Sequence, residues 1–395
     1  MKGYLRSDGR KGIRNVLLVV YTVECAHHVA REVARPFEGE DVHVIGFPGC
    51  FPNDYARIML ERLCTHPNVG GALLVSLGCE SLDKNRLARK IMESGRPTDV
   101  LTIQAVGGTR ATIERGRGWV RETQKILKAQ EPVEMAVSEL VVGTICGGSD
   151  GTSGITGNPA AGRAFDLLVE AGAACIFEET GELIGCEHIM AERAKSPELG
   201  KLLIESVAKA ARYYATLGSG SFAVGNAAGG LTTIEEKSLG AYAKSGASPI
   251  SGMLKPGDLP PRGGLYLLDV VPDGEVRFGF PNINDNAEIA ELMACGAHVN
   301  LFVTGRGSVV GSAISPVIKV CANPETFDRM ADDMDINAGK ILRGEASIDA
   351  VGSEIRDLII SLGEGGRTRS EVLGHQEFIL TYKNFEPIGP SCLPI

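Results

Sequence analysis

The sequence has few aromatic residues, no excess of positive charge and no long apolar run. Aromatic side chains make up 5% of its 395 residues, and there is one Trp. Lys and Arg number 40 against 49 Asp and Glu, so the formal net charge of −9 disfavours a general nucleic-acid coat. No segment approaches the ~20 consecutive apolar residues of a membrane span, and the start of the chain has no apolar signal core. We therefore expect a cytoplasmic protein without nucleic-acid or membrane partners.

The signatures of several common cofactor sites are also missing. No C-x-x-C pair occurs, which excludes the ordinary ferredoxin and zinc-ribbon patterns. The glycine-rich segment Cys146–Pro159 lacks the G-K-[S/T] of a Walker A loop and is not a proper G-x-G-x-x-G. The ten cysteines of a cytoplasmic chain are expected to be free thiols or metal ligands, not a disulfide framework.

Apolar, β-branched runs alternate with helix-like segments along the first third of the chain. Candidate strands cover residues 16–23, 42–47, 71–77 and 100–104, and a plausible boundary follows at 131–137. This alternation predicts an α/β fold with a parallel sheet and helices on its faces. In the second part we expect helices at 159–171, capped by Asn158, and at 354–362, capped by Ser353. Residues 246–264, rich in Pro and Gly, are expected to form a long loop or lid.

Three cysteines follow three of the candidate strands. Cys25 comes after the first, Cys50 after the second and Cys79 after the third. Ligands of open α/β sheets bind beyond the carboxyl ends of the strands, so the three thiols could converge on one point. Three ligands would leave an iron ion or a cubane cluster with an open position. The alternative is that each is a small, buried cysteine that behaves as an apolar residue.

Three segments are suited to bind an anion. The opening R-S-D-G-R-K-G-I-R-N places four basic residues before the first strand, and T-G-R-G-S places an arginine between glycines after a later strand. The segment C-G-G-S-D-G-T-S-G-I-T-G-N-P lies between a strand and a helix, where backbone N–H groups and the helix dipole attract anions. The alternatives are a solvated arm, a loop arginine in solvent and a tight turn. The candidate substrate-binding residues are Arg14, Asn15, Ser149, Asp150, Ser153, Asn158 and Arg306.

Two further segments suit proton transfer. F-E-E-T-G-E-L-I-G-C-E-H, residues 177–188, combines four carboxylates with Cys186 and His188, which suits a divalent metal or acid–base catalysis. G-G-L-T-T-I-E-E-K-S-L-G, residues 229–240, sets Lys237 beside Glu236 and suits a proton-transfer group. A solvated helix start and a surface ion pair are the respective alternatives. The acidic D-D-M-D segment fits a solvated helix face better than a cation site.

Taken together, the motifs resemble the altronate/galactarate dehydratase family. They are G-Y-x-R-x-D-G-R-x-G-x-R-N, L-G-C-E, C-G-G-S-D-G-x-S-G-x-x-x-N-P, G-G-L-T-T-I-x-E-K-S-L-G, T-G-R-G-S and D-D-M-D-I-N-A-G, in family order between Gly3 and about Phe378. The resemblance implies an iron-dependent lyase that removes water from a polyhydroxy acid and yields a 2-keto-3-deoxy acid.

The resemblance also implies an architecture and partners. Residues 1–132 are expected to form a doubly wound parallel-sheet domain, and residues 133–395 a larger, variant Rossmann-like parallel α/β domain. Single-chain members carry an additional small β-rich N-terminal domain, whereas this chain starts at G-Y-L-R-S-D-G-R. We therefore expect the large subunit of a split enzyme, in a homo- or hetero-oligomer with a separate small subunit. The related sulfolactate sulfo-lyases share that arrangement.

These observations give one site hypothesis with open alternatives. Cys25, Cys50 and Cys79 would hold iron, as Fe²⁺ or as an iron–sulfur cluster. Arg14, Arg306 and the Cys146–Asn158 loop would hold the anionic substrate, while Lys237, with Glu236 or His188, would transfer protons. A second lyase reading is the elimination of sulfite from a sulfonated hydroxy acid. Readings of another class are a nucleotide-dependent redox protein, which the missing G-x-G-x-x-G disfavours, and a non-catalytic binding subunit.

Overall fold

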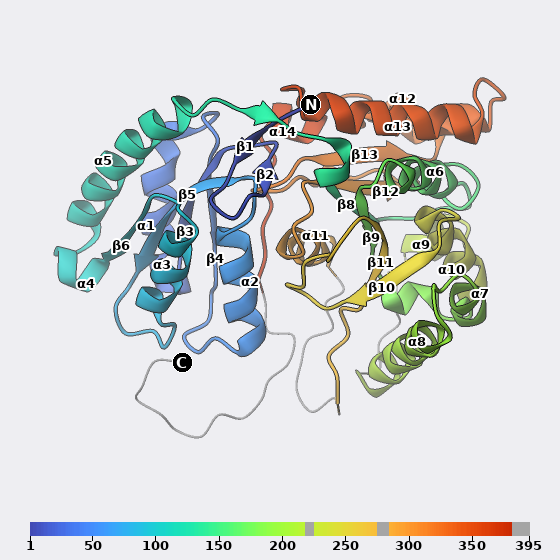
Figure 1. The fold of residues 1–395 in the computed structure, drawn as a ribbon, viewed down its shortest axis with the longest axis horizontal. Coiled ribbons are helices and arrows are strands. Elements are labelled where there is room, and N and C mark those ends of the chain that lie inside the picture. The colour runs from blue at the N-terminus through green and yellow to red at the C-terminus, as the bar shows by residue number, and fades with distance from the viewer. Residues whose placement is uncertain (218–224, 275–283, 381–395) are drawn as a thin grey trace.

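The computed structural model describes residues 1–217, 225–274 and 284–380 of the chain. It contains a four-stranded and a seven-stranded parallel sheet, joined by a small antiparallel sheet (Figure 1). The predicted α/β fold class is therefore confirmed. No helix in the described part of the chain is both long enough and apolar enough to cross a membrane.

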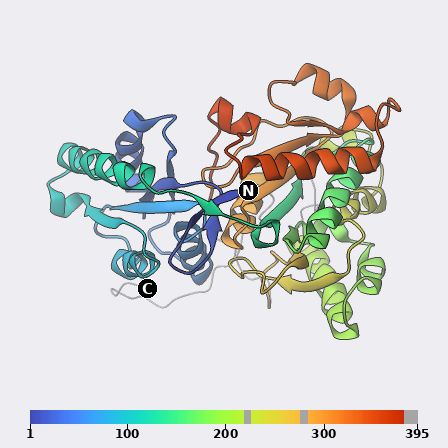
Figure 2. The same ribbon diagram turned by 45° about the horizontal axis from the view of Figure 1, so that its top comes forward.

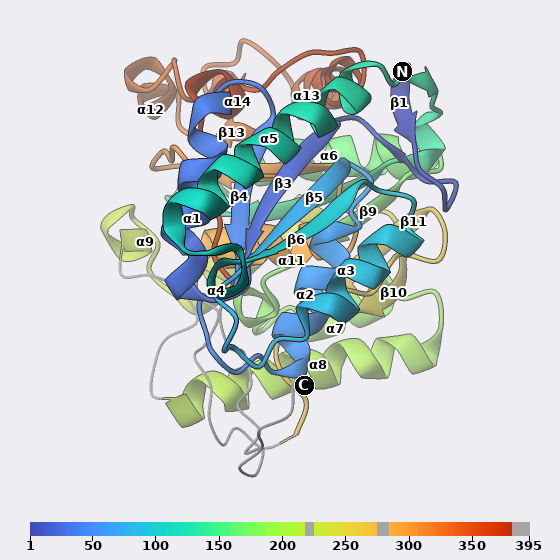
Figure 3. The ribbon, with the colours of Figure 1, turned by 90° about the vertical axis from the view of Figure 1, so that its left-hand side faces the viewer.

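The four-stranded sheet has the order β4-β3-β5-β6 and is parallel throughout. Its strands are β3 (Val16–Tyr21), β4 (Val42–Gly46), β5 (Val69–Ser76) and β6 (Thr98–Thr102). The helices of this part are α1 (Glu24–Ala34), α2 (Asp54–Cys64), α3 (Lys84–Glu93), α4 (Ile103–Val106) and α5 (Thr109–Lys128), with the 3₁₀ turn η1 (Arg35–Phe37). Successive strand residues face opposite sides, so α1 and α5 pack on one face and α2 and α3 on the other (Figure 3).

The seven-stranded sheet has the order β10-β11-β9-β8-β12-β13-β14. Its strands are β8 (Val141–Cys146), β9 (Ala174–Phe177), β10 (Ile250–Leu254), β11 (Gly264–Leu268), β12 (Val299–Thr304), β13 (Val317–Cys321) and β14 (Ile336–Asn337). Its helices are α6 (Gly157–Glu170), α7 (Glu187–Glu192), α8 (Pro197–Leu217), α9 (Gly225–Ala228), α10 (Ile234–Tyr242), α11 (Asp285–Ala294), α12 (Pro324–Arg329), α13 (Ile348–Leu362) and α14 (Arg369–Leu373). Short 3₁₀ turns are η2 (Val137–Glu139), η3 (Thr180–Leu183), η4 (Ala243–Ser245) and η5 (Ala338–Ile341).

The two large sheets share a core. Helices α6 and α13 cover one face of the seven-stranded sheet, while α11 covers the other face and packs against α2. Across that contact the hydroxyl of Tyr55 donates a hydrogen bond of 2.8 Å to Glu291. Near the N-terminus, β1 (Lys2–Leu5) pairs with both β2 (Lys11–Gly12) and β7 (Val133–Glu134), between the two halves (Figure 2). This small sheet links the first strands of the chain to β7, which begins at the expected domain boundary. The division at residues 132/133 itself remains a prediction.

Three expectations about local structure were wrong. Helix α6 begins at Gly157 after Thr156, so Asn158 lies inside the first turn and is not its N-cap. Helix α13 begins at Ile348, five residues before the expected cap Ser353. Its N-cap is Ser347, whose side chain accepts a hydrogen bond from the N–H of Ala350. The segment 246–264 contains strand β10, which pairs with β11 at the end of the sheet order and forms an isolated bridge from Ile250 to Ala194 on its other side. The expected extended tail at 385–395 lies outside the described residues.

Candidate functional site

The seven-stranded sheet has a topological switch point between β8 and β12. From β8 the chain builds β9, β10 and β11 on one side and then returns to place β12 on the other. Loops that leave the carboxyl ends of strands at such a point form the usual ligand crevice of open α/β sheets. Here the carbonyl of Gly148, after β8, accepts 3.0 Å hydrogen bonds from the N–H groups of Gly305 and Arg306, after β12.

Where other segments approach the loop after β8 most closely, there is room only for glycine. A Cβ on Gly305 would stand 2.2 Å from Oδ1 of Asp150, and one on Gly229 would stand 2.7 Å from the carbonyl of Ser149. The crowding exceeds what a simple turn requires and fixes the loop between β12 and the segment before α10. Asn226 adds to this hold, because its Oδ1 accepts a hydrogen bond of 2.9 Å from the N–H of Ser149.

Five buried polar side chains meet at the end of β8, and we call them the lysine–carboxylate cluster. Its members are Cys146, Glu179, Glu182, Lys237 and Lys244. Nζ of Lys237 lies 2.6 Å from Oε2 of Glu182, 3.1 Å from Sγ of Cys146 and 2.9 Å from Oγ of Ser149. Lys244 pairs with Glu179 and also lies 3.3 Å from Sγ of Cys146.

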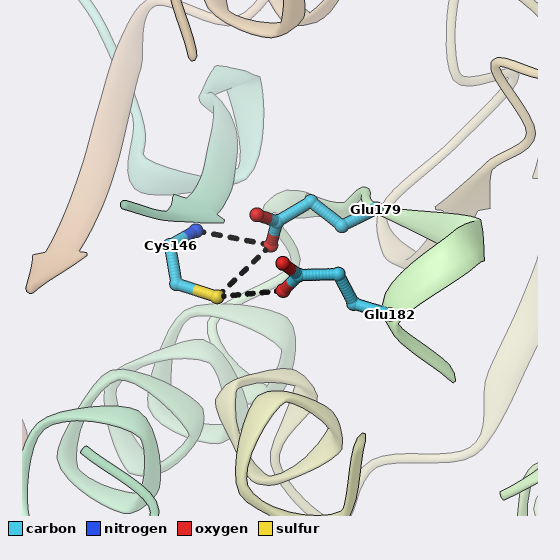
Figure 4. Close-up of side chains that lie close together, drawn as sticks. All are labelled: Cys146, Glu179 and Glu182. Atoms are coloured by element: carbon cyan, nitrogen blue, oxygen red, sulfur yellow. Dashed lines mark hydrogen bonds between the residues drawn. The ribbon is translucent and has the colours of Figure 1, made fainter. Parts of the chain in front are cut away.

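The backbone helps to aim the carboxylates. Figure 4 shows both carboxylates of the cluster pointing at Cys146, whose Sγ lies 3.3 Å from Glu179 Oε2 and 3.1 Å from Glu182 Oε2. Glu179 has a φ of 76°, in the left-handed region that costs a residue with a Cβ about 1–2 kcal/mol. Strain of this kind persists at sites where a side chain must be held in one direction.

The two lysines of the cluster are matched in number by its two glutamates. Burial alone would lower the pKa of Lys237, but Cys146 and Glu182 outweigh it and raise that pKa above its ordinary value. Burial, reinforced by Glu182, raises the pKa of the Cys146 thiol. The cluster therefore combines two lysines, two glutamates and a thiol whose pKa is raised. Lys237 is suited to donate a proton or to stabilise developing negative charge.

Cys146, Glu179 and Glu182 have the chemistry of a metal site but are already satisfied. Their ligand atoms lie within 4.8 Å of one another. However, both lysines donate to these same atoms, so their ammonium groups hold the positions that a divalent cation would take. As arranged here, the three residues fit ammonium groups and not a metal ion.

One member of the cluster, Lys237, lines a cavity of about 300 Å³. Six of the residues predicted from sequence line it, namely Ser149, Asp150, Ser153, Asn158, Glu236 and Lys237. Asn158 is 1% exposed, and its Oδ1 has no hydrogen-bond partner among the described residues. Asp150 accepts hydrogen bonds from the side chains of Thr152, at 2.5 Å, and Asn323, at 2.8 Å. A buried acceptor without a donor indicates that this cavity is built for a polar ligand.

The two predicted arginines differ in their surroundings. Arg306 is exposed beside Gly148, and no described residue accepts a hydrogen bond from its guanidinium. Arg14 forms a bidentate ion pair with Glu371, at 2.7 and 3.0 Å, and donates to the carbonyls of Leu362 and Gly366. Asn15 is likewise occupied: it donates to the carbonyl of Leu127. The structure therefore brings Arg306 to the β8 loop and gives Arg14 and Asn15 partners elsewhere.

Two of the predicted proton-transfer residues lie apart from the ammonium of Lys237. Glu236 is exposed and accepts 2.8 Å hydrogen bonds from the N–H and hydroxyl of Thr232, which lower its pKa. Adjacent residues of a helix point in different directions, so the partner of Lys237 is Glu182, 55 positions away, and not its neighbour. His188 is exposed on α7, with no hydrogen bond to the described residues.

The three predicted metal ligands lie at the carboxyl edge of the four-stranded sheet. Cys25, Cys50 and Cys79 follow β3, β4 and β5, and all three are exposed. Two of their loops are joined, since the N–H of Ser81 donates to the carbonyl of Cys50 at 2.9 Å. Among the described residues the three sulfur atoms do not form a group within 4.8 Å of one another.

Sequence analysis missed part of the cluster. Glu179 and Glu182 lay in an acidic segment that was singled out, but nothing tied them to Lys237. Cys146 was recognised only as the start of a glycine-rich loop. Lys244 carried no motif, and it lies 98 positions from Cys146. Only the return of the chain along neighbouring parallel strands brings these residues together.

The fold and the buried charged site at the switch point are those of an α/β enzyme. Residues 3–128 match the family model of the D-galactarate dehydratase/altronate hydrolase second domain, and residues 137–385 that of the D-galactarate/altronate dehydratase C-terminal domain. The chain belongs to the galactarate/altronate dehydratase family, which confirms the resemblance seen in its motifs.

Named relatives from this family are lyases. The chain is 32% identical over 397 residues to the (2R)-sulfolactate sulfo-lyase subunit beta of Chromohalobacter salexigens, with 96% of each chain covered. It is 31% identical over 382 residues to the altronate dehydratase of Bacillus subtilis, covering 92% of this chain and 74% of that one. It is 33% identical over 391 residues to the galactarate dehydratase (L-threo-forming) of Escherichia coli, covering 92% and 72%. These relationships support a lyase.

Proposed function

We propose that this chain is a cytoplasmic hydro-lyase that dehydrates a sugar acid such as altronate or galactarate to a 2-keto-3-deoxy acid. The observation that carries the proposal is the buried Lys237–Glu182 ion pair, whose lysine lines a cavity beside the glycine-rich loop. A fixed ammonium group in a site shielded from water stabilises the negative charge that forms when a proton is removed next to a carboxylate.

The cavity supplies the groups that a polyhydroxy acid needs. Asp150 and the unpartnered Oδ1 of Asn158 accept hydrogen bonds from substrate hydroxyls, while Ser149 and Ser153 both donate and accept. No carboxylate among the described residues pairs with Arg306, so its planar fork is suited to hold the substrate carboxylate. Such a site accepts an anion in spite of the negative net charge of the whole chain.

Two proton transfers complete the reaction. A base takes the proton from the carbon next to the substrate carboxylate, and an acid protonates the departing β-hydroxyl as water. Lys237, which is held protonated by Glu182 and Cys146, is assigned to the acid step. Glu236 and His188, which face solvent, are less suited than Glu182 to serve as its partner.

We further propose that Cys25, Cys50 and Cys79 bind an iron–sulfur cluster. Three exposed thiols at one sheet edge match a cluster that leaves one iron open, and in a cluster each thiolate binds its own iron. A single ion would draw all three sulfur atoms closer together than the structure has them. When bound, an open iron supplies Lewis acidity toward a substrate oxygen.

The proposal is tested by product analysis. The chain, purified without oxygen, is incubated with a panel of hexonates and hexarates, with and without iron and a reductant. We expect a 2-keto-3-deoxy acid from at least one sugar acid, with no dependence on NAD or NADP. If turnover requires a nicotinamide cofactor, the chain is a redox enzyme and the proposal fails.

A second candidate is the release of sulfite from sulfolactate. It is favoured by the relative named as a sulfolactate sulfo-lyase subunit, which aligns over 96% of its own length. Sulfite and pyruvate formed from sulfolactate, without keto acids from sugar acids, would select this reaction. Because that relative is named as a subunit, we also propose a separate small β-rich partner within a homo- or hetero-oligomer. Co-expression with the product of a neighbouring gene, followed by size-exclusion chromatography, tests for that partner.

A further inference from the structure

We propose that Asp285 is the base that takes the proton from the carbon next to the substrate carboxylate, while Lys237 protonates the leaving group. This assignment deepens the proposed function and rests on it. It differs from the residues singled out by sequence, which included no base other than Glu236 and His188. It also explains why a carboxylate without a partner among the described residues lies beside a cluster of two lysines and two glutamates.

The position of Asp285 is set by helix α11. Asn284 caps this helix by accepting a hydrogen bond from the N–H of Asn286, and Asp285 is its first residue. The helix packs against β8, the strand that ends in Cys146. Oδ2 of Asp285 lies 3.4 Å from the point where a Cβ on Gly147 would stand, so its carboxylate lies over the start of the glycine-rich loop.

The surroundings of Asp285 leave its carboxylate free to react. No side chain among the described residues forms a hydrogen bond with it, although it is partly buried. Two lysines and two glutamates already pair with one another in the cluster, and Asp285 is a further carboxylate that forms no ion pair with a described residue. Burial and the charge of Glu182 raise the pKa of Asp285 to about 6, and Lys237 opposes part of that shift.

Other charged groups near α11 are engaged elsewhere. Glu291, further along the helix, accepts a hydrogen bond from Tyr55 of α2. From β8 the neighbouring titratable group is the Cys146 thiol, whose pKa burial raises. The groups whose charges act on Asp285 are therefore Glu182 and Lys237.

An ordinary helix-start carboxylate looks different. Asp349, in the first turn of α13, has a side chain that is 77% exposed and pairs with Arg163 at 2.6 Å. Acidic residues at this position usually stabilise the helix and stay ionised. Asp285 is partly buried, forms no ion pair with the described residues and lies over the start of the glycine-rich loop, which points to chemistry and not to helix stability.

The proposed step balances. The carboxylate of Asp285 accepts the proton from C2, and the C–H electron pair forms the new C2–C3 double bond. The C3–O bond breaks, and Lys237 gives a proton to the departing hydroxyl, which leaves as water. The enol then takes a proton from solvent at C3, releases its hydroxyl proton to solvent and becomes the keto acid. Transfer of the proton from Asp285 to solvent, and uptake of one by Lys237, restore the starting state.

The test follows exchange at C2. The full chain is incubated in deuterated water with the acid from the panel that it turns over, and deuterium at C2 of the recovered substrate is measured. We expect Asp285→Asn to lose C2 exchange and to lower kcat ~10²–10⁴-fold. Lys237→Met is expected to lower the rate of elimination more than the rate of deuterium exchange at C2. Asp349→Asn, a matched change in the first turn of another helix, is expected to keep both.

Two further measurements make the test independent of a single variant. Formate added to Asp285→Ala is expected to restore part of the C2 exchange, because it supplies a small carboxylate in the vacated space. Asp285→Asn is also expected to raise Tm more at pH 7.5 than at pH 4.5, because folding holds the pKa of this carboxyl above its unfolded value.

The outcomes separate this assignment from the proposed function. A wild-type chain that acts on no hydroxy acid rejects the proposed function and this role with it. An active wild type whose Asp285→Asn variant keeps kcat and C2 exchange rejects the role of Asp285 alone. If Asp285→Asn fails to fold, the formate experiment decides: no rescue of Asp285→Ala in a folded chain counts against the base.

Discussion

Nζ of Lys237 lies 2.6 Å from Oε2 of Glu182, although 55 positions separate the two residues in sequence. The Lys237 side chain is 2% exposed and its Nζ also contacts Ser149 and Cys146, so the ammonium group is a fixed charge with few alternative positions. A charge held in advance does not have to reorganise when negative charge forms on a substrate. This pair is the centre of the proposed chemistry.

Lys237→Met is predicted to lower kcat ~10²–10⁴-fold and to change KM much less, since the ammonium acts mainly on the transition state. Lys237→Arg keeps a charge but not the compact ammonium, so it is predicted not to restore kcat. Steady-state kinetics with a sugar acid provides both values. Equal kcat for the Met variant and wild type would show that Lys237 is structural.

The same substitution is predicted to destabilise the fold. Removing one partner of a buried ion pair leaves the other uncompensated, at a cost of about 3–5 kcal/mol. The double variant Lys237→Met with Glu182→Leu is predicted to recover much of this loss, because neither charge then remains. Urea unfolding of the two variants and wild type measures the difference. A double variant less stable than the single one would contradict the pairing.

Arg306→Ala is predicted to raise KM ~10²-fold or more, because a charge-assisted bidentate contact with a carboxylate is lost. Arg14→Ala is predicted to lower Tm and to change KM much less, because Arg14 is bonded to Glu371 and to backbone carbonyls. Measuring KM and Tm for both variants distinguishes them. A large KM effect for Arg14 alone would place substrate recognition at the N-terminal segment instead.

The Arg14–Glu371 pair predicts a pH dependence of stability. Burial would raise the pKa of Glu371, but hydrogen bonds and the charge of Arg14 outweigh burial and lower it below the ordinary value of 4.5. Because the folded pKa is the lower one, the stabilisation is present above about pH 4.5 and is lost as pH falls through the folded value. Arg14→Met should therefore lower Tm at pH 7 more than at pH 3.5. Equal losses at both pH values would mean that the ion pair adds nothing.

The cysteines predict a spectroscopic signal. Protein purified without oxygen is expected to contain iron and sulfide and to absorb near ~400 nm, as thiolate-bound clusters do. Cys79→Ser is expected to lose both, whereas Cys64→Ser, at a buried position far from the sheet edge, should keep them. Elemental analysis and anaerobic absorption spectra measure this. An active protein without iron would overturn the assignment.

The sequence was sufficient to predict the strands that carry the sites. Strands β3 and β4 fall within the expected ranges 16–23 and 42–47, because β-branched apolar runs are local signals. The glycine-rich loop and Lys237 were also recognised from their own segments. They line one cavity together with Asn158. Asn158 was predicted to bind substrate because it belongs to the glycine-rich loop, and its buried oxygen without a partner among the described residues was not foreseen.

Pairing between distant segments could not be predicted. Glu236 was assigned to Lys237 because it is adjacent in sequence, yet helix geometry turns the two side chains apart and the sheet order supplies Glu182. Asp285 has no motif around it, and only the packing of α11 against β8 places it at the loop. Such residues depend on strand order, which local patterns do not encode.

The most direct test of the account is one reaction in deuterated water. The chain, with iron and its candidate small subunit, is incubated with the sugar acids and sulfolactate, and products are read by NMR and mass spectrometry. We predict a 2-keto-3-deoxy acid with one solvent deuterium at C3, formed without NAD or NADP. Strict dependence on a nicotinamide cofactor would contradict the account. So would a product that carries the original C2 hydrogen at C3 in place of solvent deuterium.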